Sequence, residues 1–256
     1  MTEELSDITT RLAERIRKEQ SGKLAPALPT KPVCHICGGI GFVRKEYPVG
    51  HEMFGKVEPC ECVKDSLYAS ISGLTPDEIS NMTWNKILPR ENVSKAVEAV
   101  NKTLTRGYGW VYIWGEVGLA KTVILKTAVA EACRAGRYAT YTNMSEVMEN
   151  LREAYDKDNP NYESAKRLEN WSKINILSID EFDRVKATEW VSEKQFRMMD
   201  TRYINATRKN TITLMAANVG PGAYDNYLSD RIEDGRFMVV ELKGESLRSQ
   251  MEYWDK

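Results

Sequence analysis

The sequence has no excess of glycine, proline or cysteine: its 256 residues include 16 Gly, 9 Pro and 5 Cys. These counts exclude collagen-like, disordered and disulfide-scaffold proteins. An excess of one sign of charge is also lacking, because 36 Lys and Arg stand against 37 Asp and Glu, and the formal net charge is −1. Binding to a nucleic acid would therefore have to come from a local basic patch.

Long apolar runs are absent as well. The longest apolar stretches, such as Val111–Trp114, are far shorter than the about 20 residues needed to cross a bilayer. The first five residues lack the basic start and the apolar run of a signal peptide. We therefore expect a cytoplasmic protein with no membrane partner.

Four of the five cysteines form two close pairs, Cys34 with Cys37 and Cys60 with Cys62. In a reducing cytosol such pairs indicate zinc rather than disulfides. Two cysteines separated by two residues can supply two tetrahedral ligands from one tight turn, and four thiolates leave no open position for water. We therefore predict that these four cysteines bind a structural zinc ion.

The spacer between Cys60 and Cys62 is shorter than in most zinc sites, so alternatives stay open. His35 and His51, the two histidines of the chain, are substitute ligands if either of these cysteines points away. The other alternative is a loop of cysteines without a metal. Cys133 lies in a helical pattern and is expected to be a small core residue.

The sequence predicts three parts. Residues 1–30 are expected to form an N-terminal helix and a linker, because the first 20 residues place apolar side chains on one side of a helix before a proline-containing stretch. This helix either packs on its own domain or docks a partner. Residues 31–75 form the predicted zinc-binding module, and residues 76–256 form one larger domain.

The larger domain alternates strands with helices. Trp110–Trp114 is apolar throughout, as expected for a strand covered on both faces. Further strands are predicted at Arg137–Thr142, Ile174–Ile179, Thr211–Ala216 and Arg236–Leu242. Helices are predicted at Asn92–Thr105, Lys121–Arg134, Ser145–Tyr155, Glu163–Trp171 and Glu189–Ala206. This order predicts an α/β fold, a parallel sheet flanked by helices, with ligands at the carboxyl ends of the strands.

A phosphate-binding motif follows the first of these strands. The pattern G-x-x-x-x-G-K-[ST] is matched by Gly115, Glu116, Val117, Gly118, Leu119, Ala120, Lys121 and Thr122, except that Ala120 replaces the last glycine. Backbone N–H groups of such a loop surround the β-phosphate of a nucleotide. Lys121 would reach the β- and γ-phosphates, and the Thr122 hydroxyl would coordinate Mg²⁺. Because Ala120 replaces the motif glycine, one alternative stays open: a nucleotide-dependent scaffold that does not hydrolyse ATP.

Two carboxylates follow the strand at Ile174–Ile179. Asp180 would bind magnesium directly or through water, and Glu181 would orient and help deprotonate the attacking water. A solvated strand end is the alternative for such a pair on its own. Because a guanine-reading N-K-x-D sequence is absent downstream, ATP is favoured over GTP.

With these residues in view, the stretch from about Met82 to the C-terminus resembles the helicase-loader branch of the AAA+ P-loop NTPases, the DnaC and IstB type. The resemblance rests on the phosphate loop, on Asp180-Glu181, and on the segments 214–218, 227–231 and 244–248. It implies that Asn218 positions the water, that Arg231 is an arginine finger, and that Arg248 senses the γ-phosphate. The alternative for Arg231 is a surface salt bridge with Asp230 or Glu233.

The resemblance implies an ATP-dependent DNA replication protein that loads a hexameric replicative helicase onto single-stranded DNA. A finger that acts on a neighbour's nucleotide implies a homo-oligomer formed on ATP or DNA binding. The alternative is an IstB-type transposase helper. Candidate DNA contacts are Arg202, Tyr203, Arg208 and Lys209, although a solvated helix face explains them equally well.

Overall fold

The computed structural model describes residues 34–246 except 39, 52, 88–90 and 155–159. The helix expected within residues 1–30 and the predicted sensor Arg248 lie outside the described residues. The chain divides into two compact units, residues 1–62 and 63–256, and we describe each by itself. No helix among the described residues has the length and apolar character required to cross a membrane.

The first unit, described from residue 34, has little regular structure. Its strands β1 (Phe42–Val43) and β2 (Glu58–Pro59) pair antiparallel. Among its described residues, the buried side chains are those of Cys37 and Cys60. The unit therefore buries very little apolar surface of its own.

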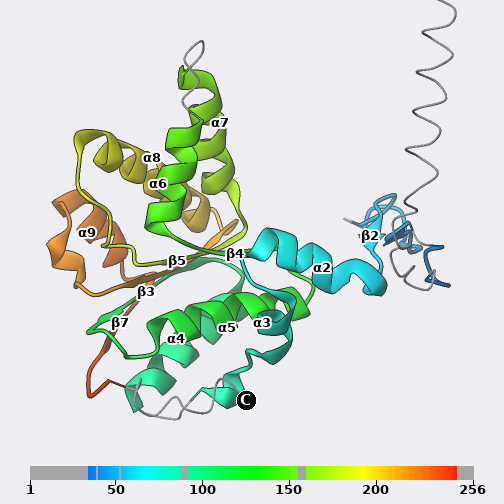
Figure 1. Cartoon of the computed structure of the whole chain (residues 1–256), viewed down its shortest axis with the longest axis horizontal. Coiled ribbons are helices and arrows are strands. Elements are labelled where there is room, and N and C mark those ends of the chain that lie inside the picture. The colour runs from blue at the N-terminus through cyan, green and yellow to red at the C-terminus, as the bar shows by residue number, and fades with distance from the viewer. Residues whose placement is uncertain (1–33, 39, 52, 88–90, 155–159, 247–256) are drawn as a thin grey trace, which may run out of the picture. The chain divides into compact units, whose positions relative to one another are not determined.

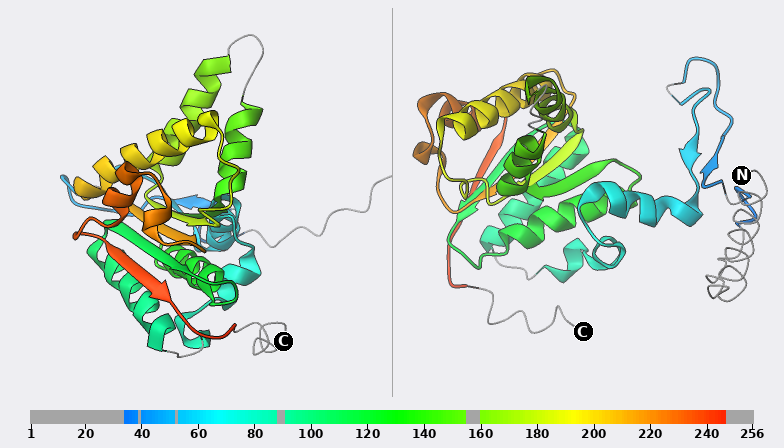
Figure 2. Two further views of the ribbon diagram at one scale, coloured as in Figure 1. Left: turned by 90° about the vertical axis from the view of Figure 1, so that its left-hand side faces the viewer. Right: turned by 45° about the horizontal axis from the view of Figure 1, so that its top comes forward.

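The second unit contains a five-stranded sheet in the order β4-β5-β6-β3-β7, in which every neighbouring pair is parallel. Its strands are β3 (Gly109–Gly115), β4 (Ala139–Asn143), β5 (Ile176–Asp180), β6 (Ile212–Ala217) and β7 (Met238–Leu242). The red β7 lies at one edge of the sheet (Figure 2, left). The predicted α/β fold with a parallel sheet is confirmed, and each predicted strand is present within about three residues of its predicted bounds.

Helices cover both faces of this sheet (Figure 1). The described helices from residue 61 onward are α2 (Glu61–Ser72), α3 (Pro76–Asn81), α4 (Glu91–Arg106), α5 (Lys121–Arg134), α6 (Met144–Glu153), α7 (Pro160–Lys173), α8 (Glu189–Thr207) and α9 (Asn226–Ile232). The helices α4 and α5 pack on one face, whereas α6, α7 and α8 lie on the other. Two short 3₁₀ turns, η1 (Trp84–Lys86) and η2 (Pro221–Ala223), complete the described elements of this unit.

Alternation along the central strand β3 divides the core into two layers. Val111 and Ile113 belong to the apolar cluster under α4 and α5, while Trp110 and Tyr112 belong to the cluster on the opposite face. All four side chains are at most 1% exposed. Burial on both faces explains why this strand is a continuous apolar run in the sequence.

Helix α5 begins at Lys121, within the phosphate-binding motif, as predicted. Its N-cap residue, Ala120, offers no side-chain hydrogen bond to the first turn. By contrast, α3 and α6 each begin with a capping box, formed by Thr75 and by Asn143. The first N–H groups of α5 are thus oriented toward the motif loop with no capping side chain, which is the arrangement that favours an anion.

Candidate nucleotide site and cysteine cluster

The motif loop between β3 and α5 requires glycine at two positions. At Gly115, with φ +147°, a Cβ atom would lie 2.2 Å from the carbonyl oxygen of Leu242 on the neighbouring strand β7. At Gly118, with φ +88°, a Cβ atom would lie 2.1 Å from Oγ of Ser246. Close packing therefore fixes both glycines of the motif.

Ala120 occupies the last glycine position of the motif and adopts the left-handed conformation, with φ 63° and ψ 14°. The loop thus keeps a backbone conformation that glycine adopts at no steric cost. For alanine this conformation costs about 1–2 kcal/mol. The exchange leaves this left-handed turn in place but adds strain to it.

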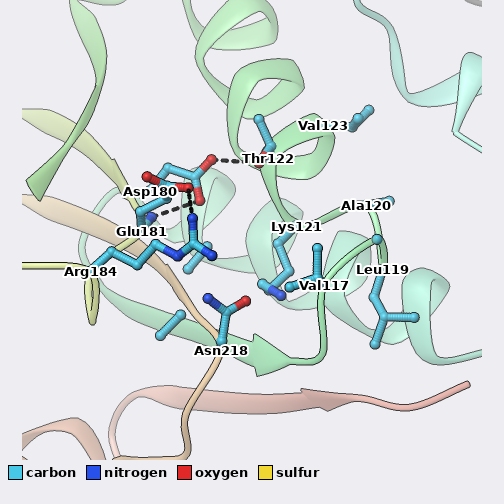
Figure 3. Close-up of a pocket in the computed structure, with 13 residues that line it drawn as sticks. Val117, Leu119, Ala120, Lys121, Thr122, Val123, Asp180, Glu181, Arg184 and Asn218 are labelled. Atoms are coloured by element: carbon cyan, nitrogen blue, oxygen red, sulfur yellow. Dashed lines mark hydrogen bonds and ion pairs between the residues drawn. The ribbon is translucent and has the colours of Figure 1, made fainter. Parts of the chain in front are cut away.

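Lys121, the first residue of α5, extends under the loop. Its side chain is largely buried, and its Nζ donates hydrogen bonds to the carbonyl oxygens of Gly115, at 2.5 Å, and Glu116, at 2.7 Å. The ammonium group is therefore held at the base of the loop and faces the cavity described below (Figure 3).

The Thr122 hydroxyl lies beside the carboxylate at the end of β5. Its Oγ1 donates to Oδ2 of Asp180 at 2.6 Å, and the Tyr141 hydroxyl from β4 donates to the same oxygen at 3.0 Å. The backbone N–H of Glu181 donates to Oδ1 at 2.8 Å. Burial, followed by the Asp180 charge, raises the pKa of Tyr141, so this hydroxyl stays protonated and donates. These contacts orient the buried Asp180 toward Thr122.

Glu181 follows Asp180 with a left-handed backbone, φ 46°, and its side chain is half exposed. An ion pair joins its Oε1 to the Arg184 guanidinium at 3.3 Å. In Figure 3, the Arg184 side chain reaches Glu181 from the side of the site opposite Lys121. The candidate general base is thus already partnered by a cation.

These groups line one cavity of ≈420 Å³ at the carboxyl ends of β5 and β6 (Figure 3). Its lining comprises Val117, Gly118, Leu119, Ala120, Lys121, Thr122, Val123, Asp180, Glu181, Arg184, Ala216, Ala217 and Asn218. The structure therefore brings most of the predicted site residues together. Gly115 and Glu116 line a neighbouring hollow, which Leu119 and Asn218 also line. The Asn218 backbone N–H donates to Oδ2 of Asp183 at 3.1 Å.

Arg231 lies in α9 and is not among the described residues that line this cavity. It forms an ion pair with Asp200 of α8, and its guanidinium lies 3.6 Å from the ring centroid of Tyr227 and 4.6 Å from that of Tyr203. The structure thus pairs Arg231 with Asp200, and not with either of the two acidic neighbours proposed as the alternative. Its side chain lines a second cavity, of ≈310 Å³, between α8 and α9.

The prediction that Arg202 contacts DNA is wrong. Its side chain is completely buried and donates to Oγ1 of Thr213 and to four backbone carbonyls, those of Trp171, Ser172, Ile174 and Ile212. Burial lowers the pKa of this guanidinium, which the five acceptors solvate in place of water. Tyr203 is half-buried and donates to Asp234, whereas Arg208 and Lys209 are exposed.

The four predicted zinc ligands converge in the first unit. The sulfur atoms all lie within 4.8 Å of one another, with 3.8 Å between Cys34 and Cys60 and 3.5 Å between Cys37 and Cys62. A tetrahedral site with metal–sulfur bonds of about 2.3 Å has sulfur–sulfur edges of about 3.8 Å. The cluster therefore has the size that zinc requires, and four cysteines could hold the ion without a histidine.

Backbone hydrogen bonds support the same cluster. The N–H of Gly41 donates to Sγ of Cys37 at 3.3 Å, and the N–H of Gly38 donates to the Cys34 carbonyl at 2.8 Å, which closes the turn between the first two cysteines. Backbone N–H groups of Cys37 and Ile36 lower the pKa of the Cys34 thiol. Such donors stabilise thiolate ligands.

Sequence reasoning missed two residues of the nucleotide site, Tyr141 and Arg184. Tyr141 lies in β4, and its contact with Asp180 follows from the register that pairs β4 with β5. Arg184 could have been found from a local signal. It is a cation three positions after Glu181, and a turn brings such positions together.

No protein-family model and no curated protein matches the sequence. Solved structures do match. The AMPPCP-bound DnaA of Aquifex aeolicus has a TM-score of 0.55 and 22% identity, over 66% of this chain and 53% of that one. DnaI has a TM-score of 0.51 and 16% identity, over 68% and 94%. The DnaC helicase loader has a TM-score of 0.53 and 15% identity, over 64% and 98%.

The chain spans about half the length of the DnaA structure and nearly all of the two loader-type structures. At these identities the likeness concerns the fold. Together with the parallel sheet and the phosphate-binding loop, it shows that this chain has the AAA+ P-loop fold.

Proposed function

We propose that this protein is an ATP-dependent DNA replication protein that loads a hexameric replicative helicase onto single-stranded DNA. The observation that carries the ATP-dependent part is the 2.6 Å contact between Thr122 and Asp180 at the mouth of the motif loop. A hydroxyl and a carboxylate side by side are the protein ligands that a nucleotide-bound Mg²⁺ takes in P-loop proteins.

The nucleotide would lie in the cavity above Lys121. The loop from Gly115 to Ala120 would surround the β-phosphate with N–H groups, and Lys121 would exchange its carbonyl partners for phosphate oxygens. Thr122 and Asp180 would hold Mg²⁺, which neutralises charge on the phosphates when it is bound. The donor set fits this ion, because both side chains present oxygen atoms.

Hydrolysis needs a water positioned in line with the leaving group and a cation that stabilises the charge on the transferred phosphoryl group. Glu181 would orient and deprotonate the water, and Asn218 would position it from the end of β6. Arg231 lies outside its own nucleotide cavity, so we assign it to the nucleotide of a neighbouring copy, with Arg248 as the sensor of the γ-phosphate. A site completed by a neighbour supports assembly of a homo-oligomer on ATP or DNA binding.

The proposed partners follow from the matched proteins. One matched DnaA structure is described as bound to AMPPCP and single-stranded DNA, and another matched protein is a helicase loader. We assign to this chain single-stranded DNA and a replicative helicase as partners. We also propose that Cys34, Cys37, Cys60 and Cys62 hold zinc, which requires the reducing conditions of the cytoplasm.

The test is ATP turnover by the full-length protein with and without single-stranded DNA, assayed together with binding to a hexameric helicase. Glu181→Gln should lower the turnover rate by about 10²- to 10⁴-fold while nucleotide binding persists. Glu193→Gln, an exposed carboxylate that does not line the cavity, is the matched control. Absence of turnover in the parent protein would favour a non-hydrolysing scaffold, and absence of helicase binding would refute the loader.

A further inference from the structure

The nucleotide cavity contains a second cation that the phosphate-binding motif does not account for. Of the described residues that line it, Lys121 and Arg184 carry positive side chains, and Asp180 and Glu181 carry negative ones. Lys121 sits at the base of the loop on two backbone carbonyls. Arg184 approaches from the opposite side, where it meets Glu181 (Figure 3).

The backbone that carries Arg184 is fixed. Its N–H donates to the Glu181 carbonyl at 2.9 Å, and the N–H of Phe182 donates to the Ala216 carbonyl of β6 at 2.9 Å. The Phe182 ring is buried and meets the rings of Tyr112 and Tyr224 edge-on. Because the turn is tied to the sheet, Glu181 and Arg184 are held at the cavity whatever their side chains contact.

The side chain of Arg184, by contrast, is weakly held. Its described contact is the 3.3 Å ion pair with Glu181, and the two side chains are 57% and 48% exposed. Ion pairs of this exposure contribute about 0–1 kcal/mol. A phosphate offers a guanidinium shorter, bidentate hydrogen bonds and a larger charge, so it would compete successfully for Arg184.

We propose that Arg184 is a second phosphate-binding residue of this site. When a nucleoside triphosphate binds, the Arg184 guanidinium moves from Glu181 to the terminal phosphate. This inference rests on the proposed nucleotide site and adds a residue to it. Lys121 at the base of the loop serves the phosphates common to di- and triphosphates. Arg184, on the far side of the cavity beside the base, serves the phosphate that only a triphosphate has.

The transfer of Arg184 from Glu181 to the phosphate also links nucleotide binding to catalysis. While Arg184 donates to Oε1 of Glu181, the ion pair turns this carboxylate toward the guanidinium. Transfer of the guanidinium to the terminal phosphate releases the oxygen. Binding of a triphosphate therefore frees Glu181 to turn toward the attacking water, and Arg184 acts both as a ligand of the phosphate and as the group that positions the base.

The experiment measures binding of Mg²⁺–AMPPCP and Mg²⁺–ADP to the full-length protein and to its Arg184→Gln variant. AMPPCP affinity should fall about tenfold, the loss expected for one charge-assisted hydrogen bond, while ADP affinity stays within about twofold. Arg184→Lys should retain part of the AMPPCP affinity. Lys186→Gln, an exposed cation of the same loop that does not line the cavity, should leave both affinities unchanged.

Equal losses of AMPPCP and ADP affinity, or no loss of either, would overturn the assignment of Arg184 to the terminal phosphate. Faster turnover in Arg184→Gln with unchanged affinities would also overturn it, because Arg184 would then only restrain Glu181. If the parent protein binds neither probe, the nucleotide site itself is wrong. That outcome is distinguishable from failure of the Arg184 assignment alone. If only that assignment is wrong, the parent protein binds the probes and Lys121→Ala abolishes the binding.

Discussion

The two units of this chain are stabilised in opposite ways. The parallel sheet of residues 63–246 is buried on both faces by helices, and its central strand β3 is almost wholly inaccessible. The first unit buries two cysteine side chains among its described residues and exposes six large apolar ones: Ile36, Ile40, Phe42, Val49, Phe54 and Val57. Apolar burial suffices for the sheet, whereas the small unit needs a cross-link between its cysteines.

Removal of the proposed zinc ion gives the largest expected difference between the units. A strong chelator should unfold the cysteine unit, because the binding energy of a structural zinc ion, about 10–16 kcal/mol, is folding energy for a unit of this kind. The sheet unit should keep its thermal unfolding transition. Metal content and amide hydrogen exchange of residues 34–62, measured before and after chelation, check this.

Cys133 supplies the internal control for that measurement. It is buried in α5, and burial raises the pKa of its thiol to about 11, so it should resist alkylation at neutral pH in the presence and absence of metal. The four clustered cysteines should become reactive only after chelation. A purified protein with no stoichiometric metal, or clustered cysteines that react equally in both states, would contradict the zinc site.

The buried guanidinium of Arg202 offers the next largest effect, confined to the sheet unit. Arg202→Ala should lower the free energy of unfolding by about 3–5 kcal/mol, because its five acceptors lose their donor and a cavity forms. Chemical denaturation checks the value. Arg208→Ala, at an exposed position two turns along, should change stability by less than about 0.5 kcal/mol. Equal effects of the two changes would contradict the assigned role.

Sequence alone predicts the sheet unit well, since its signals are local. Buried parallel strands are apolar runs, and the phosphate-binding motif fixes where β3 ends and α5 begins. Arg202 shows where local signals fail. It lies in a charged stretch of α8 that is typical of a solvated face, but its acceptors come from the end of α7 and from the start of β6. Only the tertiary arrangement brings those carbonyls to one point.

The contact of Arg231 has the same origin. Asp200 is 31 positions from Arg231, so nothing near Arg231 in the sequence indicates that partner, although Asp230 and Glu233 are acidic. The convergence of the four clustered cysteines was predictable, because cysteine is rare in this chain and its spacing carries the chemistry. Which of the four clustered cysteines are buried could not be predicted in the same way, since the first unit has no periodic apolar pattern.

The smallest expected effect concerns the strained residue at the junction of β3 and α5. Ala120→Gly should raise the free energy of unfolding of the sheet unit by about 0.5–1 kcal/mol, because relief of the left-handed strain exceeds the entropy that glycine adds to the unfolded chain. Ala128→Gly, in the helical interior of α5, should instead lower it by about 1 kcal/mol or more. Thermal denaturation with and without chelator checks both changes, and neither should alter the metal dependence of the cysteine unit. Destabilisation by Ala120→Gly would mean that alanine fits this turn without strain, and the exchange of the motif glycine would then need another physical reason.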